Sequence, residues 1–101
     1  MTATALTVST SRQPDRTPVL VATGEIDRSN AAAFGAALRG ALPDHGSLVV
    51  DLTAVEYVDT AGLTELFPHA GSIEIVVTSL LAPVLTISGL AAMAVIRQVE
   101  P

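Results

Sequence analysis

Two short polar segments hold the residues whose types could do chemistry. One is Gly24–Asp27 (GEID) and the other is Asp59–Gly62 (DTAG), and each follows an apolar run of β-strand type. In open α/β sheets, binding sites gather at the edge where the carboxyl ends of the strands meet. We therefore expect Asp27, Asp59 and Thr60 to lie on one rim of a sheet.

The Asp59-Thr60 pair has two interpretations at the start of a helix. In the simpler one, a side-chain oxygen of the pair caps the helix by accepting from free N–H groups of its first turn. In the functional one, the Thr60 hydroxyl is exposed at the positive end of the helix dipole, where a phosphoryl group would be stabilised. Gly62 would then leave room for the active site of a kinase to approach.

Other kinds of chemistry lack the residues they need. The chain has no cysteine, which excludes disulfides, thiolate metal sites and a cysteine nucleophile. His45 and His69 stand in separate Pro- and Gly-containing loops without a second ligand at metal spacing. The sequence also contains no Gly-x-Ser-x-Gly elbow and no glycine-rich phosphate loop. We expect no catalytic residue, no metal and no cofactor.

One enzyme class keeps an alternative open. A chain of this length with Asp-Thr could be half of a dimeric aspartic protease, in which two carboxylates share a proton. That class has an all-β fold and, as a rule, glycine directly after Asp-Thr, whereas Ala61 stands there in this chain. Substantial helix content would exclude it.

Composition predicts a small aliphatic core and an acidic surface. The chain has 101 residues, the size of one domain, so we expect a single domain over 1–101. Half of the residues are hydrophobic, but only two Phe and one Tyr are aromatic. Ten acids stand against five arginines and no lysine, a net charge of −5 that argues against nucleic acid as a partner.

The order of apolar runs and turn residues predicts an α/β fold. Strands at 5–9 and 18–24 are expected to form a hairpin across a polar turn at 11–17. Asn30 is expected to cap a helix with Phe34 and Leu38 on its buried face. Further strands are expected at 47–58, 72–77 and 94–99, with short helices at 60–67 and 80–87. This order predicts a mixed β-sheet of four to five strands with short helices packed against it by right-handed crossovers.

The C-terminal third carries no charged residue from Ile75 to Ile96. That length could cross a membrane, but Pro83 and the Ser88-Gly89 pair divide the run, and no Lys/Arg cluster flanks it. We therefore expect a buried strand, helix and strand rather than a span, with Leu85 and Ile87 in the core. With no signal peptide at the N-terminus and no cysteine, we expect the cytoplasm.

The two polar segments and the elements around them resemble those of the STAS-domain anti-sigma factor antagonists, also called anti-anti-sigma factors. The resemblance covers most of the chain and implies a STAS-like single domain. The matching residues are Gly24–Asp27, Asn30 with Phe34 and Leu38, Leu48–Thr53, Val55–Leu63 and Ile87–Leu90.

The resemblance also implies a function. In that family the hydroxyl residue directly after the Asp, Thr60 here, is phosphorylated by a partner anti-sigma factor that is a serine/threonine kinase. The unphosphorylated antagonist binds the anti-sigma factor and frees a sigma factor, and phosphorylation ends the binding. A phosphatase is a further candidate partner, and we expect a monomer or weak dimer. By the same resemblance, the partner-binding residues are Glu25, Asp27, Asn30, Asp59, Ala61, Gly62 and Leu63.

The chain departs from the family pattern in two ways. The acceptor in the family is usually Ser, and the segment after it is longer than Leu63–Gly71, which here contains Pro68. Proline ends or kinks a helix because it lacks the N–H group and clashes with the preceding turn. The alternative is a non-switching STAS subunit of a lipid-transport or membrane transporter complex, in which Thr60 need not be phosphorylated.

Overall fold

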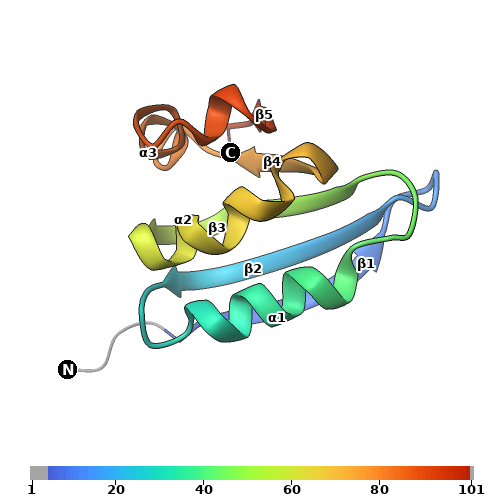
Figure 1. Cartoon of the computed structure of the whole chain (residues 1–101), viewed down its shortest axis with the longest axis horizontal. Coiled ribbons are helices and arrows are strands. Elements are labelled where there is room, and N and C mark those ends of the chain that lie inside the picture. Colours follow the sequence, from blue (N-terminus) through green and yellow to red (C-terminus); the bar gives the residue numbers. More distant parts are fainter. Residues whose placement is uncertain (1–4, 101) are drawn as a thin grey trace.

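The computed structural model describes residues 5–100, which form one five-stranded sheet with the helices packed against it (Figure 1). The strands lie in the order β1-β2-β3-β4-β5 across the sheet. The elements are β1 (Thr7–Arg12), β2 (Pro18–Ile26), α1 (Ala31–Ala41), β3 (Leu48–Val58), α2 (Thr60–Leu66), the 3-10 helix η1 (Phe67–Ser72), β4 (Ile73–Val77), α3 (Ala82–Ile87), the 3-10 helix η2 (Leu90–Ala92) and β5 (Val95–Gln98).

The direction of the strands puts the helices on one face of the sheet. β1 and β2 form an antiparallel hairpin, whereas β2, β3, β4 and β5 pair in parallel with their neighbours. Each parallel step moves in the same direction along the sheet, so right-handed crossovers bring α1, α2 and α3 to the same side. Figure 1 shows α1 and α2 side by side over β2 and β3. The predicted mixed α/β sheet is confirmed, and its helices exclude the all-β aspartic protease.

The core lies between these helices and the covered face of the sheet. Leu20, Val50 and Ile75 stand in one row across β2, β3 and β4 and are almost fully buried. The helices contribute the large buried side chains Phe34, Leu38, Leu66 and Leu85. The core is aliphatic apart from Phe34, as the composition predicts.

The first hairpin is longer than expected. β1 runs from Thr7 to Arg12 rather than over 5–9, so residues 11 and 12 belong to the strand and not to the turn. The turn is closed by the Gln13 N–H, which donates to the Thr17 carbonyl at 2.9 Å. Every residue of β1 is exposed, and its second half, Ser9–Arg12, contains no hydrophobic residue. Hydrophobic alternation, the main sequence signal for a strand, is therefore absent from that half.

The C-terminal third folds as a strand, a helix and a strand, as predicted. Pro68 ends α2 as expected, since the chain continues from Phe67 as a 3-10 helix with Pro68 in its first turn. Leu85 is fully buried, but the prediction for Ile87 is wrong because its side chain is 85% exposed. Two residues turn an α-helix by about 200°, which puts Ile87 opposite Leu85. Among residues 5–100, no helix has the length and apolar character needed to cross a membrane.

Asn30 holds a loop instead of capping α1. Its side chain makes no hydrogen bond to the helix. Its Nδ2 donates to the Glu25 carbonyl and its Oδ1 accepts from the Asp27 N–H, both at 2.9 Å. The Asp27 carbonyl accepts from the Ala31 N–H at 2.8 Å, so a backbone group takes the place of the expected side-chain cap.

Gly62 seats α2 on the ends of β2 and β3. A Cβ at this position would lie 2.7 Å from methyl carbons of both Ile26 and Val58. Gly62 is itself buried. The expectation that Gly62 leaves room for a kinase is therefore wrong, since the space that it leaves lies inside the protein.

We predict that Asn30→Ala lowers the free energy of unfolding by about 1–2 kcal/mol, the value of two partly buried hydrogen bonds. Asn30→Ser is the control, because serine is a good N-cap but is too short to join Glu25 to Asp27. Chemical denaturation should find both variants similarly destabilised. Wild-type stability of Asn30→Ser would mean that capping is the role of this residue.

Gly62→Ala is predicted to destabilise the protein by about 1–3 kcal/mol, because the branched side chains beneath it have little room to move. Gly40→Ala is the matched control, since Gly40 is also helical and a Cβ there would meet nothing within 4 Å. This change should be neutral or stabilise by up to about 1 kcal/mol. Equal unfolding midpoints for the two variants would contradict the close packing of α2.

Candidate functional site

The carboxyl ends of β2 and β3 meet at one edge of the sheet. β2 extends through Ile26, two residues beyond the expected end, so Asp27 alone of the first polar segment follows its strand, whereas the whole of Asp59–Gly62 follows β3. Ile26 pairs with Val58 at the end of the ladder between these strands. Asp27 and Asp59 come next along each chain segment and face a shared open hollow of about 470 Å³. The structure therefore brings the two aspartates together on one rim, as expected.

Asp59 is the cap of α2. Its Oδ1 accepts from the Gly62 N–H at 3.2 Å, and its carbonyl accepts from the Leu63 N–H at 3.0 Å. Its own N–H donates to the Ile26 carbonyl at 3.1 Å, which ties the start of α2 to the end of β2. For Asp59 the simpler capping interpretation is correct.

Because Asp59 caps α2, the Thr60 hydroxyl is not needed as the helix cap. Thr60 is the first residue of α2 and its side chain is exposed. Its carbonyl accepts from the Thr64 hydroxyl at 2.7 Å. Within residues 5–100, no side-chain hydrogen bond involves the Thr60 hydroxyl. This hydroxyl is therefore exposed at the first turn of α2, directly after Asp59.

Asp27 brings a fixed negative charge to the rim. The Ser29 hydroxyl donates to its Oδ1, and so does the Ser29 N–H at 2.9 Å. These two bonds, the hydroxyl first, favour the carboxylate and hold the pKa of Asp27 below its usual value. Asp27 is consequently ionised at neutral pH.

Arg28 also lines the hollow that Asp27 and Asp59 share. Nothing in the sequence distinguishes it from Arg39 or Arg97 except its position directly after Asp27. In the structure Arg39 lies 3.5 Å from Glu65, and Arg97 lies 3.4 Å from Glu74. Arg28 is exposed and brings a positive charge to the rim.

The remaining predicted residues differ in how accessible they are. Glu25, Asn30 and Ala61 are half-buried, and Asn30 fixes the loop that carries Asp27. Gly62 and Leu63 are buried on the inner side of α2. These two residues support the rim from beneath, so a partner would meet the backbone and side chains above them.

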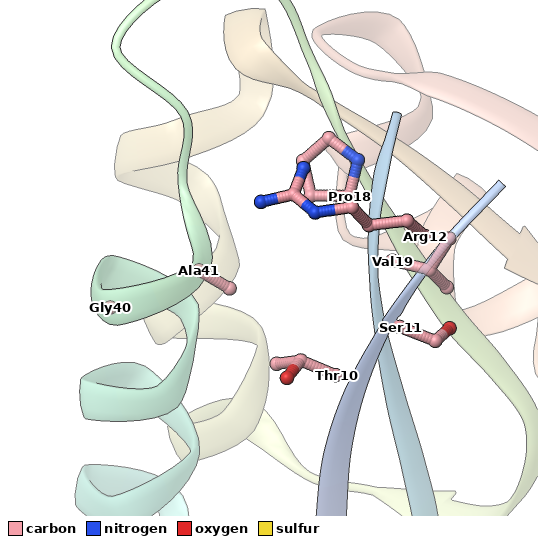
Figure 2. Close-up of a pocket in the computed structure, with 7 residues that line it drawn as sticks. All are labelled: Thr10, Ser11, Arg12, Pro18, Val19, Gly40 and Ala41. Atoms are coloured by element: carbon pink, nitrogen blue, oxygen red, sulfur yellow. The ribbon is translucent and has the colours of Figure 1, made fainter. Parts of the chain in front are cut away.

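Another hollow, of about 330 Å³, lies between β1 and the end of α1 (Figure 2). Thr10 and Ala41 point toward it from opposite walls, while Ser11 points away. Arg12 at its rim donates from Nη1 to the Arg16 carbonyl at 3.1 Å. The lining contains no acid or histidine that could act as a general base. In the described part of the chain, no group of three or more His, Cys, Asp or Glu could hold a metal ion.

Comparison with solved structures supports the predicted fold. A crystal structure of an anti-sigma factor antagonist from Mycobacterium paratuberculosis has a TM-score of 0.82 at 23% sequence identity, covering 92% of this chain and 86% of that one. An uncharacterized protein of the DUF3478 family with a SpoIIAA-like fold, from Shewanella loihica PV-4, has a TM-score of 0.67 at 11% identity. It covers 100% of this chain and 90% of that one.

Comparison with sequences shows the family. No curated protein matches the chain. The family model described as "Mlab, STAS domain" matches residues 9–97, which is most of the chain and includes both rim segments. The sequence match to this family and the similarity to solved structures thus both confirm the STAS-like fold that the resemblance implies. This chain belongs to the STAS-domain family.

Proposed function

We propose that this protein is an anti-sigma factor antagonist that is switched off by phosphorylation of Thr60. The observation that carries the proposal is the exposed Thr60 hydroxyl, which stands directly after the capping Asp59 on a rim shared with Asp27. The shared fold with a crystal structure described as an anti-sigma factor antagonist supports the same role.

The proposed partner is an anti-sigma factor with serine/threonine kinase activity. The unphosphorylated rim binds this partner and frees a sigma factor, with contacts from Glu25, Asp27, Asn30, Asp59 and Ala61 over the buried Gly62 and Leu63. The antagonist is the substrate of the kinase and not itself an enzyme. A phosphatase returns Thr60 to the binding form, and the site of action is the cytoplasm, where sigma factors act.

Phosphorylation would end the binding through charge. A phosphate adds about −1.5 to −2 charge at neutral pH. On Thr60 it would join the ionised Asp27 and would stand directly beside Asp59, and Arg28 is the cation among the side chains that line the hollow. Burying this surplus of negative charge against a partner removes its water, and close like charges in such an interface cost several kcal/mol. No refolding of α2 is needed.

A second candidate function is favoured by exposed apolar side chains in the C-terminal third. Leu80 is 64% exposed, Ile87 85% and Met93 59%. A non-switching STAS subunit of a lipid-transport or membrane transporter complex would cover such side chains permanently with its partner. In that role Thr60 carries no phosphate, and charge at Thr60 has no effect on assembly.

We predict that Thr60 is the only residue phosphorylated when the chain is incubated with its anti-sigma factor kinase and ATP. Mass spectrometry should find one phosphate on the wild type and none on Thr60→Ala. Thr64→Ala is the matched control, because Thr64 is exposed on the same helix, and it should be phosphorylated like the wild type. Equal phosphorylation of Thr60→Ala would contradict the assignment.

Charge on Thr60 is predicted to weaken binding to the anti-sigma factor by about 1 kcal/mol or more at low salt. Calorimetric titration should find this loss for Thr60→Glu but not for Thr60→Gln, which has the same size without the charge. The difference should shrink as salt rises, because salt screens exposed charges. If Thr60→Glu binds as tightly as Thr60→Gln at low salt, charge repulsion does not end the binding.

A further inference from the structure

The face of the sheet opposite the helices carries a regular pattern of its own. Side chains alternate between the two faces of a strand, so the neighbours of the buried Leu20, Val50 and Ile75 point away from the core. The pairing register aligns them into one row across β2, β3, β4 and β5: Val19, Val49, Glu74 and Val95. The row is aliphatic except for a single carboxylate.

Val49, Glu74 and Val95 of this row line an open hollow of about 530 Å³ at the amino ends of β3, β4 and β5. Val49 is buried at its base, while Met93 and Val95 on its rim are 59% and 62% exposed. The tip of the β1–β2 hairpin forms another part of its wall. The hollow therefore combines apolar surface with walls from separate loops.

The charged side chains that line the hollow are both acidic, Asp15 and Glu74. Asp15 is held in place by the Thr17 N–H, which donates to its Oδ1 at 3.0 Å. This bond and that of the Thr17 hydroxyl keep the pKa of Asp15 below its usual value. Glu74 lies 3.4 Å from Arg97 through one oxygen, Oε2.

We propose that this hollow is a docking site for a segment of a partner protein that presents an arginine or lysine beside an aliphatic side chain. The aliphatic side chain would cover the exposed Met93 and Val95, and the cation would approach Asp15 and Glu74. Arginine and lysine suit such a place because their stems pack on apolar surface while the charged head meets the carboxylates. Charge complementarity selects a basic segment over an acidic one.

The hollow lies at the opposite edge of the sheet from Thr60. It is lined at the amino ends of β3 and β4, whereas Thr60 follows the carboxyl end of β3. A segment bound here leaves the phosphorylation rim free. The docking site can therefore be tested independently of the proposed switch, and failure of one would not imply failure of the other.

The test is a nuclear magnetic resonance titration of the ¹⁵N-labelled chain with acetyl-Leu-Arg-amide, and with acetyl-Leu-Glu-amide as the probe of opposite charge. The basic probe should shift the amide signals of Val49, Glu74 and Val95 in a saturable way, and the acidic probe should not. Asp15→Asn keeps the acceptor for the Thr17 N–H but removes the charge, and should weaken binding about threefold or more. Glu56→Gln, an exposed acid outside the hollow, is the matched control and should bind like the wild type.

Three results would overturn the proposal. One is equal shifts from both probes, and another is unchanged binding by Asp15→Asn. The third is a dimer in sedimentation that Met93→Glu dissociates, because the hollow would then be covered by a second copy of this chain.

Discussion

The close contact of α2 with the ends of β2 and β3 determines the geometry of the rim. Gly62 lies where a Cβ would be 2.7 Å from methyl groups of Ile26 and Val58, and the Asp59 N–H bonds to the Ile26 carbonyl. These contacts fix the first turn of α2 with respect to β2, the strand that Asp27 follows. The position of Thr60 on the rim is a consequence of packing in the core, so its hydroxyl stays exposed without support from hydrogen bonds of its own.

The rim and the amino-end hollow divide the surface into two regions with different chemistry. At the carboxyl edge, Asp27, Asp59 and Arg28 line one hollow, and the exposed Thr60 comes directly after Asp59. These three side chains carry a formal net charge of −1, and a phosphate would add about −1.5 to −2 more. At the amino ends of β3, β4 and β5, the acids Asp15 and Glu74 lie beside exposed apolar side chains, and the proposed binding there does not depend on phosphorylation. The proposed switch and the proposed docking site therefore lie at opposite ends of the same sheet.

The sequence was sufficient for the order of the elements and for the rim, because both depend on local patterns. Apolar runs followed by Asp27 and by Asp59 place both residues at strand ends, whatever the details of packing. Asn30 and Gly62 were assigned the wrong roles for a physical reason. A side chain such as Asn30 can cap a helix or join a loop, and only tertiary contacts decide between the two. The absence of a side chain at Gly62 can serve an outside partner or an inside neighbour, and the sequence does not show which.

The most direct test of the account is to compare the chain with and without phosphate on Thr60, the phosphate being incorporated during synthesis. If the phosphate only adds charge to a fixed rim, changes in amide chemical shift should be confined to residues 25–30 and 59–64. The Leu63 amide, which bonds to the Asp59 carbonyl, should keep its protection from hydrogen exchange. Loss of that protection, or shifts that spread through β3 and β4, would show that phosphorylation unfolds the start of α2 and would contradict the account.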